Sequence, residues 1–329
     1  MIITSNVVRL LAALPVVGAT AVASKPFDVK GLSLREVGAR NTLEWRIWLE
    51  KDGEPISFWH DIPLYPDPED KSIIHYYTEI PRWTDGKIET KRDEPLNPIF
   101  HDEKNDLPRF VYSVWPHKTY PFNYGSIPQT WEDKNHDHPF TGYPGDNDPV
   151  DIFDISELPP SYIGQVKKVK VLGALAMIDD EATDWKVIAI DVEDPVASKV
   201  ESVEDLDKYR PGVRQQMYDW FIYYKVVKGD GTNTILGEDY QNATFAQQVL
   251  SESHDYWLDL MKGKSKPGKI VRNQTSNARF CSTYIPKEET TEAFKLPSES
   301  EILPAAEKPE EYSRWYYLDP ENNWEQIQV

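Results

Sequence analysis

The chain has 329 residues, of which 40% are hydrophobic, and this is enough to bury a substantial core in a soluble globular protein. Its 55 acidic and 36 basic residues give a formal net charge of −19, which argues against nucleic acid as a natural partner because clustered Lys and Arg bind phosphate backbones. A single cysteine, Cys281, excludes an intrachain disulfide framework and a metal site with two cysteine ligands. Because the net charge is strongly negative, an anionic ligand would need metal ions to mediate its binding.

The N-terminal segment predicts a targeting function. Residues 7–23 are apolar except for Arg9 and Thr20, contain no acidic residue, and end in two small-x-small triplets at 19–21 and 21–23. This pattern predicts a secretory signal peptide over residues 1–23, and hence a protein of the secretory pathway or the extracellular space. A mitochondrial presequence would be richer in Arg and amphipathic; mitochondrial and cytoplasmic locations stay open as alternatives. The apolar run is too short for a membrane span, so no membrane contact is expected after signal removal.

The first half of the chain carries strand patterns. Apolar and polar residues alternate over 41–50, Asp52-Gly53 marks a turn, and residues 73–80 predict a second strand. A turn at Asp85-Gly86 then leads into a short strand over 87–90, which together with 73–80 predicts a hairpin. Alternation along the short strand places Lys87 and Glu89 on one face.

A further strand is expected over residues 109–114, before a loop that is dense in aromatic residues. The aromatic residues of this loop are Trp115, Tyr120, Phe122, Tyr124 and Trp131. Tyr124 would ordinarily be a core aromatic residue whose hydroxyl contacts water, and the same holds for Tyr224 later in the chain.

An acidic stretch follows at residues 145–151, GDNDPVD. In an extended backbone Asp146 and Asp148 face the same way, and Pro149 holds Asp148 out of the helical region. The bend would bring Asp151 to the same site. Like charges about 4 Å apart repel by about 4 kcal/mol per pair at an effective dielectric of about 20, so a compact arrangement needs cations. Oxygen-only ligands favour Mg²⁺, Mn²⁺ or Ca²⁺ over Zn²⁺.

Two other interpretations of this stretch are possible. A solvated Asn-Asp-Pro turn is the ordinary interpretation of such a stretch in isolation. In an EF-hand loop that begins at Asp146, Asp148 fits the third position and Glu157 the twelfth. Val150 stands where the fifth ligand is needed and Asp151 stands where a glycine is required, so the EF-hand interpretation is rejected.

The second half begins with strands and continues with helices. Residues 162–178 and 185–192 predict strands, separated by an acidic connection at 179–184 that alone would be a solvated turn. Helices are expected over 204–209, 211–225 and 242–261. Strands followed by helices favour a closed or partly open β-barrel with helices outside it.

The chain divides into three predicted regions. The signal peptide at 1–23 precedes a main domain over 24–285, and a Pro-, Glu- and Ser-rich C-terminal extension over 286–329 lies along the surface. We expect the aromatic residues at 315–318 to pack against the main domain.

Several segments together resemble a known family. They are EIPRWTDGKIE at 79–89, RFV at 109–111, NYGSIPQTWED at 123–133, GDNDPVD at 145–151, DDEATDWKVIAID at 179–191 and YYK at 223–225. In this order they resemble the soluble family I inorganic pyrophosphatases (inorganic diphosphatases) in their longer eukaryotic form, from about residue 37 to residue 257. The resemblance implies a mainly β fold with flanking helices (α+β), an OB-like five-stranded barrel. It also implies Mg²⁺-dependent hydrolysis of the small-molecule substrate diphosphate to two orthophosphates, and a homodimer.

The resemblance also implies roles for individual residues. Metal ligands are Asp146, Asp151, Asp184, Asp179 and Glu89, and they hold several Mg²⁺, or alternatively Mn²⁺, in one active site. Asp148 is the general base that takes a proton from water, since neighbouring cations keep it ionised. The phosphate-binding residues are Arg109, Lys87, Lys186, Tyr124, Tyr224 and Lys225. Glu79 supports the site by orienting a lysine and water.

The chain departs from the usual pattern of the family at two places. The residues after the acidic stretch read Phe153-Asp154-Ile155-Ser156, and residues 116–122 lack the usual His-Gly-rich approach to Tyr124. None of the implied ligands is lost, so an active enzyme is predicted. A nucleic-acid-binding OB module, which the charge of −19 opposes, and a calcium-binding structural protein are the alternatives.

Overall fold

A computed structural model describes residues 27–319 and 325–326 of the chain. The predicted signal peptide at residues 1–23 lies outside these residues. None of the helices in the described part has both the length and the apolar character that a membrane crossing requires.

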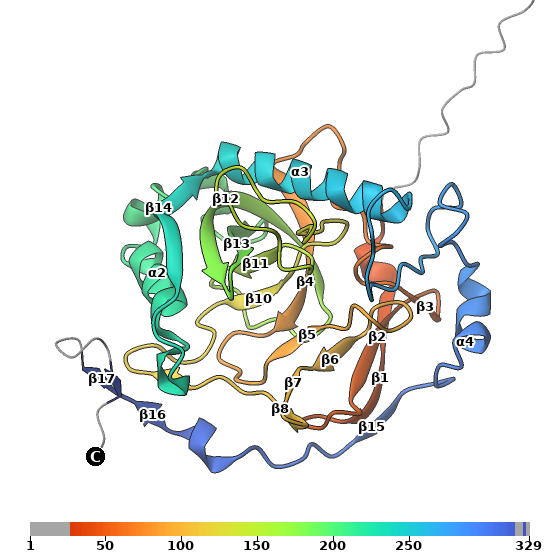
Figure 1. Ribbon diagram of the computed structural model, residues 1–329, viewed down its shortest axis with the longest axis horizontal. Coiled ribbons are helices and arrows are strands. Elements are labelled where there is room, and N and C mark those ends of the chain that lie inside the picture. The colour runs from red at the N-terminus through yellow and green to blue at the C-terminus, as the bar shows by residue number, and fades with distance from the viewer. Residues whose placement is uncertain (1–26, 320–324, 327–329) are drawn as a thin grey trace, which may run out of the picture.

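Short strands make up most of the regular structure (Figure 1). The strands are β1 (Leu32–Ala39), β2 (Arg46–Lys51), β3 (Glu54–Ile56), β4 (Ile73–Ile80), β5 (Ile88–Thr90), β6 (Ile99–His101), β7 (Glu103–Lys104), β8 (Leu107–Pro108), β9 (Ser113–Val114), β10 (Asn123–Ser126), β11 (Asp151–Asp154), β12 (Val166–Asp179), β13 (Ala182–Asp191), β14 (Thr234–Asn242), β15 (Glu301–Leu303), β16 (Trp315–Tyr316), β17 (Leu318–Asp319) and β18 (Glu325–Gln326). The α-helices are α1 (Leu206–Tyr209), α2 (Val213–Tyr223), α3 (Ala243–Met261) and α4 (Thr290–Ala293). Single turns of 3₁₀ helix occur at η1 (Val29–Gly31), η2 (Ala197–Lys199), η3 (Val226–Lys228), η4 (Lys287–Glu289) and η5 (Glu310–Ser313).

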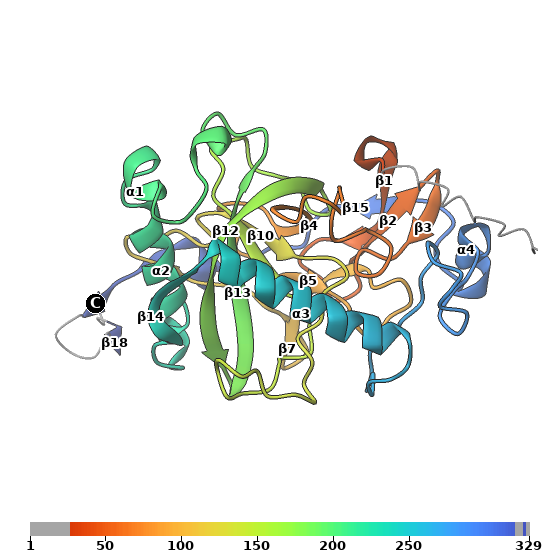
Figure 2. The same cartoon turned by 90° about the horizontal axis from the view of Figure 1, so that it is seen from above.

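The central sheet closes into a barrel. Its strand order is β13-β11-β10-β4-β12-β14, and a further pairing between β13 and β12 completes a ring of five strands. β11 and β13 run parallel, and the other pairs of this sheet are antiparallel. Helix α3 lies along one side of this ring and α2 lies beside β14 (Figures 1 and 2). The predicted OB-like barrel with peripheral helices is confirmed.

The middle of β12 and the middle of β13, at residues 171–177 and 187–190, are apolar because both of their faces are buried there. Alternate residues of β12 enter different cores: Leu175 and Met177 pack with the aromatic side chains of α2, whereas Ala174 and Ala176 pack under α3. A strand that is covered on both faces reads as a continuous apolar run rather than as an alternating one. The strand expected over 162–178 is one of the two long barrel strands, β12, but it begins only at Val166.

A second sheet packs beside the barrel. Its order is β15-β1-β2-β6-β5, with β3 added to β2. The predicted turn at Asp52-Gly53 joins β2 to β3, and both residues have positive φ, 57° and 82°. Positive φ at both central residues matches the right-handed twist of the flanking strands, which explains the Asp-Gly pair.

Three strand predictions need correction. Residues 73–80 and 87–90 do not form a hairpin: β5 pairs with β6 instead, because the intervening residues carry the chain from the barrel to the second sheet. The strand expected over 41–50 begins only at Arg46, after a turn that contains Asn41 with φ of 65°. Only Ser113 and Val114 of the segment 109–114 lie in a named strand.

The acidic connection at 179–184 is much shorter than predicted. β12 ends at Asp179 and β13 begins at Ala182, so the turn consists of Asp180 and Glu181, both with positive φ. Asp179 and Asp184 therefore lie on paired strands, which fixes their side chains more firmly than a loop would.

The three predicted helices are all present with shorter boundaries. α2 begins at Val213 rather than Pro211, and α3 begins after Asn242, whose side-chain oxygen accepts a hydrogen bond from the Phe245 amide at 2.9 Å. This N-cap satisfies one of the free amides of the first turn.

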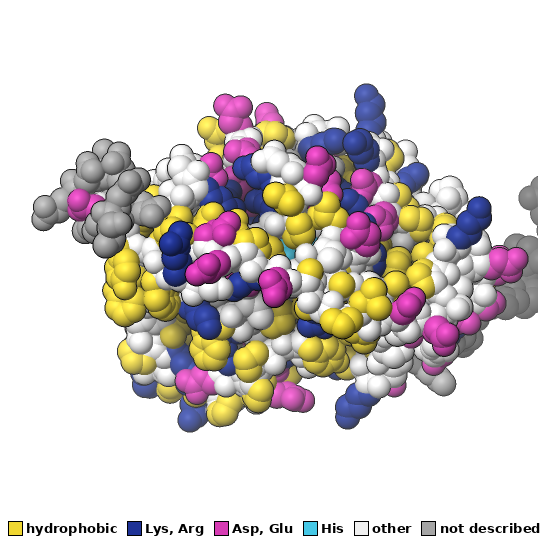
Figure 3. Space-filling model, turned by 90° about the horizontal axis from the view of Figure 1, so that it is seen from below, with side chains coloured by type: hydrophobic (Ala, Val, Ile, Leu, Met, Phe, Trp, Pro, Cys, Tyr) yellow, Lys and Arg dark blue, Asp and Glu magenta, His cyan; other side chains and the backbone are white. Residues whose placement is uncertain are grey.

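The C-terminal segment runs around the outside of the molecule, along the lower edge of Figure 1. It adds β15 to β1 in parallel and β16 to β9 in parallel. Trp315 also packs edge-on against Trp115, so this part of the predicted aromatic segment contacts the main domain. Seen from below, hydrophobic, acidic and basic side chains are interspersed over this side of the molecule (Figure 3). The boundary between main domain and extension at residue 286 stays a prediction.

Candidate active site

A cavity of about 740 Å³ opens at one end of the barrel. All of the site residues predicted from the sequence line it: Glu79, Lys87, Glu89, Arg109, Tyr124, Asp146, Asp148, Asp151, Asp179, Asp184, Lys186, Tyr224 and Lys225. They come from strands of both sheets, from Lys87 directly before β5, from Arg109 directly after β8, from the loop between β10 and β11, and from the residues that follow α2. The cavity therefore gathers residues that are up to about a hundred and fifty positions apart in the chain because the barrel closes on itself.

The acidic loop reaches this cavity by a bend rather than by an extended backbone. Asn147 has φ of 79°, and the Asp148 amide donates to Asp146 Oδ1 at 3.0 Å. The expectation that residues 146–148 are extended is wrong, because Asn tolerates the left-handed region and the Asp146 side chain bonds the backbone two residues on. Asp146 and Asp148 nevertheless both line the cavity.

Gly145 is required by a close backbone approach. A Cβ at this position would lie 2.2 Å from the carbonyl carbon of Glu132, a distance that no side chain can occupy. Hydrogen bonds then join the two segments, from the Asn147 amide to the Glu132 carbonyl at 3.0 Å and from the Glu132 amide to the Asp148 carbonyl at 2.9 Å. The acidic loop is thus clamped along residues 132–133.

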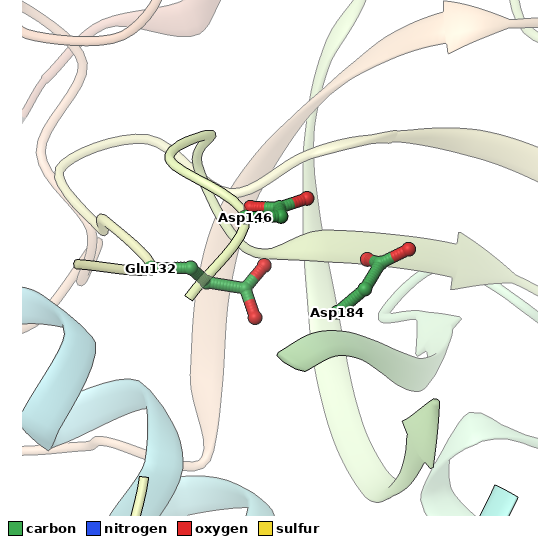
Figure 4. A group of neighbouring side chains, drawn as sticks. All are labelled: Glu132, Asp146 and Asp184. Carbon is green, nitrogen blue, oxygen red and sulfur yellow. The ribbon is translucent and has the colours of Figure 1, made fainter. Parts of the chain in front are cut away.

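The hydrogen bonds to residues 132–133 also bring Glu132 into the cluster of carboxylates. Glu132 was not predicted as a site residue from the sequence. Carboxyl oxygens of Glu132, Asp146 and Asp184 all lie within 4.8 Å of one another, and the three groups converge from two loops and a strand (Figure 4). Glu132 Oε1 accepts a hydrogen bond from the Trp185 amide at 2.9 Å. Its other oxygen, Oε2, is buried and has no hydrogen-bond partner among the described residues. This unpaired oxygen fits a ligand for a cation.

Electrostatics oppose the ionisation of these carboxylates. Burial, reinforced by Asp146 and Asp184, raises the pKa of Glu132 well above its usual range. Burial and the charges of Asp184, Asp148 and Asp151 do the same to the pKa of Asp146. The pKa of Asp184 rises to about 6, mainly through burial, although Lys186 opposes the rise. A bound cation would reverse these shifts by favouring the charged form.

Asp148 has a cationic partner that the sequence did not indicate. Arg92 Nη1 donates to Asp148 Oδ2 at 2.6 Å, and the two side chains are 41% and 40% exposed. Desolvation in the cavity raises the pKa of Asp148 to about 7; Arg92 lowers it, while Glu89 and Asp151 raise it. Asp148 is therefore open to the cavity and paired with a cation, and in the metal-free protein its pKa lies close to neutrality.

Lys186 lies at the centre of the cluster. Its register on β13 places it opposite Asp151 of the parallel strand β11. The ammonium group contacts the Asp151 carboxylate, lies 2.5 Å from Asp184 Oδ1 and donates to the Tyr124 hydroxyl at 2.9 Å. These two carboxylates raise the pKa of Lys186 well above its usual range despite burial, so it stays charged.

Three more of the predicted cations are each paired with a carboxylate. Lys225 binds Asp179, Lys87 binds Glu89, and Arg109 binds Asp102. Burial would raise the pKa of Asp179, but Lys225 outweighs it and lowers the pKa below its usual value. The Lys87–Glu89 pair confirms that these two residues share a face. Phosphate oxygens could replace these carboxylates, because both are anionic acceptors for the same donors.

Glu79 and Tyr224 line the cavity through uncharged contacts. Glu79 is 2% exposed and accepts a hydrogen bond from Thr90 Oγ1 at 2.6 Å, rather than from a lysine. Burial, with Asp151, raises the pKa of Glu79 to about 8. The Tyr224 ring stacks on Trp220 at 4.6 Å, which fixes the direction of its hydroxyl. The predicted role of Glu79 in orienting a lysine stays a prediction.

The missed residues differ in the signal that could have revealed them. Glu132 stands in the family-like segment 123–133, next to Asp133, so a search for acids near aromatic residues would have found it. Arg92 and Asp102 stand in ordinary charged segments that resemble solvated surface. Only the fold reveals that they face Asp148 and Arg109.

Comparisons with known proteins identify relatives of this chain. A family model described as inorganic pyrophosphatase matches residues 76–258. An inorganic pyrophosphatase of Neurospora crassa is 44% identical over 292 residues, which cover 87% of this chain and 97% of that protein. A solved inorganic pyrophosphatase from Schistosoma japonicum has a TM-score of 0.80 and 36% identity, covering 87% of this chain and 99% of the other. An N-terminally truncated vacuolar soluble pyrophosphatase from Trypanosoma cruzi, solved in complex with PPi, has a TM-score of 0.66 and 34% identity, covering 79% and 99%.

Proposed function

The chain belongs to the inorganic pyrophosphatase family, and on that premise we propose a Mg²⁺-dependent hydrolysis of diphosphate to two orthophosphates in the acidic cavity. It is a diphosphatase hydrolase. The finer proposal concerns the cations that the cavity holds and the residue that activates water.

The observation that supports the proposal most strongly is the unsatisfied acidic cluster. Glu132, Asp146 and Asp184 converge within 4.8 Å, and Glu132 Oε2 has no partner in the described part of the chain. Buried carboxylates in such numbers are costly unless cations neutralise them. Oxygen-only donors suit Mg²⁺, with Mn²⁺ as an alternative.

We assign the cations to the carboxylates of the cavity. Asp146, Asp151 and Asp184 would hold one cation, Asp151 would share a second, and Asp179 with Asp184 would take a third, with Glu89 nearby. Glu132 would complete this set beside Asp146 and Asp184. When bound, such cations neutralise phosphate oxygens and lower the pKa of the attacking water.

Asp148 acts as the general base in this proposal. Its carboxylate lies in the cavity beside the other carboxylates, where bound cations would keep it ionised and able to accept a proton from water. Arg92 holds Asp148 in place through the 2.6 Å contact. A carboxylate held in this way needs no reorientation before it accepts the proton.

The basic side chains of the cavity bind the phosphoryl groups of the substrate. Arg109 presents a planar fork for two oxygens, whereas Lys87, Lys186 and Lys225 act as compact charges. Hydroxyls of Tyr124 and Tyr224 add uncharged donors. As substrate enters, each basic side chain exchanges its carboxylate partner for a phosphate oxygen. Each therefore keeps an anionic partner throughout.

Release of orthophosphate from diphosphate by residues 24–329 tests the proposal. We expect turnover with Mg²⁺, restored activity with Mn²⁺ after chelation, and loss of turnover in excess chelator. No orthophosphate with either cation would contradict the proposal. A salt-dependent shift of a labelled oligonucleotide would instead favour a nucleic-acid-binding module, and binding of Ca²⁺ without turnover would favour a structural calcium protein.

We also propose a homodimer. Trp115, Trp315 and Tyr317 are 55%, 39% and 47% exposed and form one aromatic cluster, with Trp115 5.4 Å from Trp315 and 6.0 Å from Tyr317. Trp83 is 51% exposed as well. Light scattering should give twice the mass of one chain for the wild type, and less for Trp115→Ser. A wild-type mass of one chain would contradict the dimer.

The secretory or extracellular location is proposed from the N-terminal segment alone. This location is tested by measuring diphosphatase activity in secreted and intracellular fractions and by sequencing the N-terminus of the active protein. Cleavage after residue 21 or 23 with secretion is the expected result. Activity only in mitochondria or cytosol would contradict it.

A further inference from the structure

The C-terminal segment lies directly behind one wall of the cavity. Residues 109–112 alternate between two faces, as in a strand: Arg109 and Val111 line the cavity, whereas Phe110 and Tyr112 face outward. A rigid support on the outer face would therefore fix the direction of Arg109 on the inner face.

Tyr312 of the C-terminal segment supplies this support. Its ring stacks on Tyr112 with a centroid distance of 4.5 Å and an interplanar angle of 24°, and it lies 5.2 Å from the ring of Phe110. Tyr316 packs edge-on against Tyr112 at 4.9 Å. Aromatic pairs of this kind contribute beyond the area they bury and hold a defined geometry. Two rings from the C-terminal segment thus cover the outward rings of the Arg109 segment.

An ion pair and a strand pairing fasten the same segment at its two ends. Lys308 binds the carboxylate of Asp85, whose carbonyl accepts a hydrogen bond from the Val111 amide at 2.8 Å. On the other side, the Trp115 amide donates to the Tyr316 carbonyl at 2.8 Å. The C-terminal segment therefore touches the chain before and after the residues that carry Arg109, as its course along the lower edge of Figure 1 illustrates.

The Arg109 segment also carries Lys87 with it. The Lys87 amide donates to the Arg109 carbonyl at 2.9 Å, and the Asp102 amide donates to the Lys87 carbonyl at 2.8 Å. Movement of residues 109–111 would thus displace two cations of the cavity together. His101 Nε2 contacts the Arg109 carbonyl at 2.6 Å, so some support remains without the C-terminal segment.

We propose that Tyr312 is a positioning residue of the phosphate site: its ring, stacked against Phe110 and Tyr112, holds Arg109 and Lys87 in the geometry that binds substrate phosphate. The inference rests on the proposed phosphate-binding role of Arg109. Tyr312 touches no reacting atom. Tyr312 acts through packing alone. It contacts side chains on one side of residues 109–112, and any movement of this backbone would also move Arg109 on the other side.

The test compares Tyr312→Ala, which removes the ring, with Tyr312→Phe, which keeps it. Steady-state hydrolysis at fixed Mg²⁺ should show KM for diphosphate raised by about 10- to 100-fold by Tyr312→Ala with kcat changed much less, since misplacement of a group by about an ångström can cost up to about 10²-fold. Inhibition by inorganic phosphate should weaken in parallel. Tyr312→Phe should behave as wild type. Ile302→Ala, a control at a 65% exposed position of the same segment, should also behave as wild type.

A double-mutant cycle separates this inference from the proposed function. Arg109→Ala should raise KM, and Tyr312→Ala should add little in that background because both changes act on the same contact. If Arg109→Ala leaves KM unchanged, the role of Arg109 fails. If Arg109→Ala raises KM but Tyr312→Ala does not, or raises it equally in both backgrounds, the positioning role of Tyr312 is overturned.

Lys308→Ala provides a second route if Tyr312→Ala does not fold. It releases the C-terminal segment from Asp85 but keeps both aromatic rings, so we expect a smaller rise in KM with an unchanged kcat. An unchanged KM in Lys308→Ala, together with wild-type phosphate inhibition, would overturn the inference on this route.

Discussion

Strands β11 and β13 carry aspartates near both of their ends, and the two ends have opposite character. At the cavity end, Asp151 and Asp184 belong to a crowded set of carboxylates. At the far end, Asp154 and Asp191 share one lysine, Lys167, at 2.9 and 2.6 Å. The same two strands thus present the same residue type in two different environments.

The far end is electrostatically complete. Asp154 also accepts hydrogen bonds from the Tyr76 hydroxyl at 3.0 Å and from the Ser156 amide at 2.9 Å. Burial opposes the charge of Lys167, but the two aspartates outweigh it and raise the pKa of that lysine. Every partner is supplied by the chain itself, as expected of buried charges whose role is structural.

The cavity end is incomplete in the absence of cations. Glu132 has an unpaired buried oxygen, and the pKa values of Glu132, Asp146 and Asp184 are all raised. Stability alone would favour partners or protonation at this end. The comparison teaches that buried carboxylates mark a functional site when their environment opposes their charge, rather than whenever they are clustered.

The largest expected difference between the two ends is in turnover. Asp148→Asn should lower kcat by about 10²–10⁴-fold, the usual contribution of a general base, while Mg²⁺ binding is largely kept. Asp154→Asn, the matched change at the far end, should leave kcat within about threefold if the protein folds, because it touches no substrate. Orthophosphate release at saturating diphosphate measures both. Unchanged turnover in Asp148→Asn would remove Asp148 as the base.

For the free energy of unfolding, we expect the larger effect from the substitution at the far end. Lys167→Met leaves two buried aspartates unpaired at the far end and should cost about 3–5 kcal/mol of unfolding free energy. In metal-free protein, Asp146→Asn removes one of several repelling carboxylates and should leave stability unchanged or raised by about 1 kcal/mol. Urea unfolding in excess chelator measures both. A large loss of stability in Asp146→Asn would show that the cavity end needs no cation to be stable.

A smaller effect is expected in the pH dependence of stability. Burial raises the pKa of Glu79 to about 8 in the fold, above its unfolded value near 4.3, so the fold binds the extra proton and loses stability as pH rises through about 8. His60 and His75, with pKa values lowered to about 3 and 4 by burial, affect stability only below pH of about 6.5.

Metal-free protein should therefore melt a few degrees lower at pH 8.5 than at pH 6.5. Glu79→Gln should weaken this dependence without abolishing it, because the pKa values of Glu132, Asp146 and Asp148 are raised as well. Thermal unfolding in chelator at the two pH values provides the measurement. A melting temperature that rises over this range in the wild type would contradict the assignment of a raised pKa to Glu79.

The barrel and most of the residues that line the cavity were predictable from the sequence because both depend on local patterns. Continuous apolar runs indicated β12 and β13, and the Asp-Gly pair at 52–53 indicated a turn. Strand partners were not visible: β5 pairs with β6 rather than β4, since pairing is decided by packing between distant segments. For the same reason the sequence did not reveal that Arg92 meets Asp148.

Backbone conformation at single residues was the other source of error. The left-handed conformation of Asn147 bends a loop that was expected to be extended, and the tight turn at Asp180-Glu181 moves Asp179 and Asp184 onto strands. Neither change alters which carboxylates meet. The residue types required by the chemistry were therefore predictable, whereas the backbone that presents them was not.

Calorimetric titration with Mg²⁺ in the absence of diphosphate tests the central claim most directly, that the cavity end is a site completed by cations. We expect wild type and Asp154→Asn to bind Mg²⁺ with the same stoichiometry above one ion per chain, and Asp146→Asn to lose at least one ion or to bind far more weakly. Failure of the wild type to bind Mg²⁺, or equal binding by Asp146→Asn and the wild type, would contradict the claim.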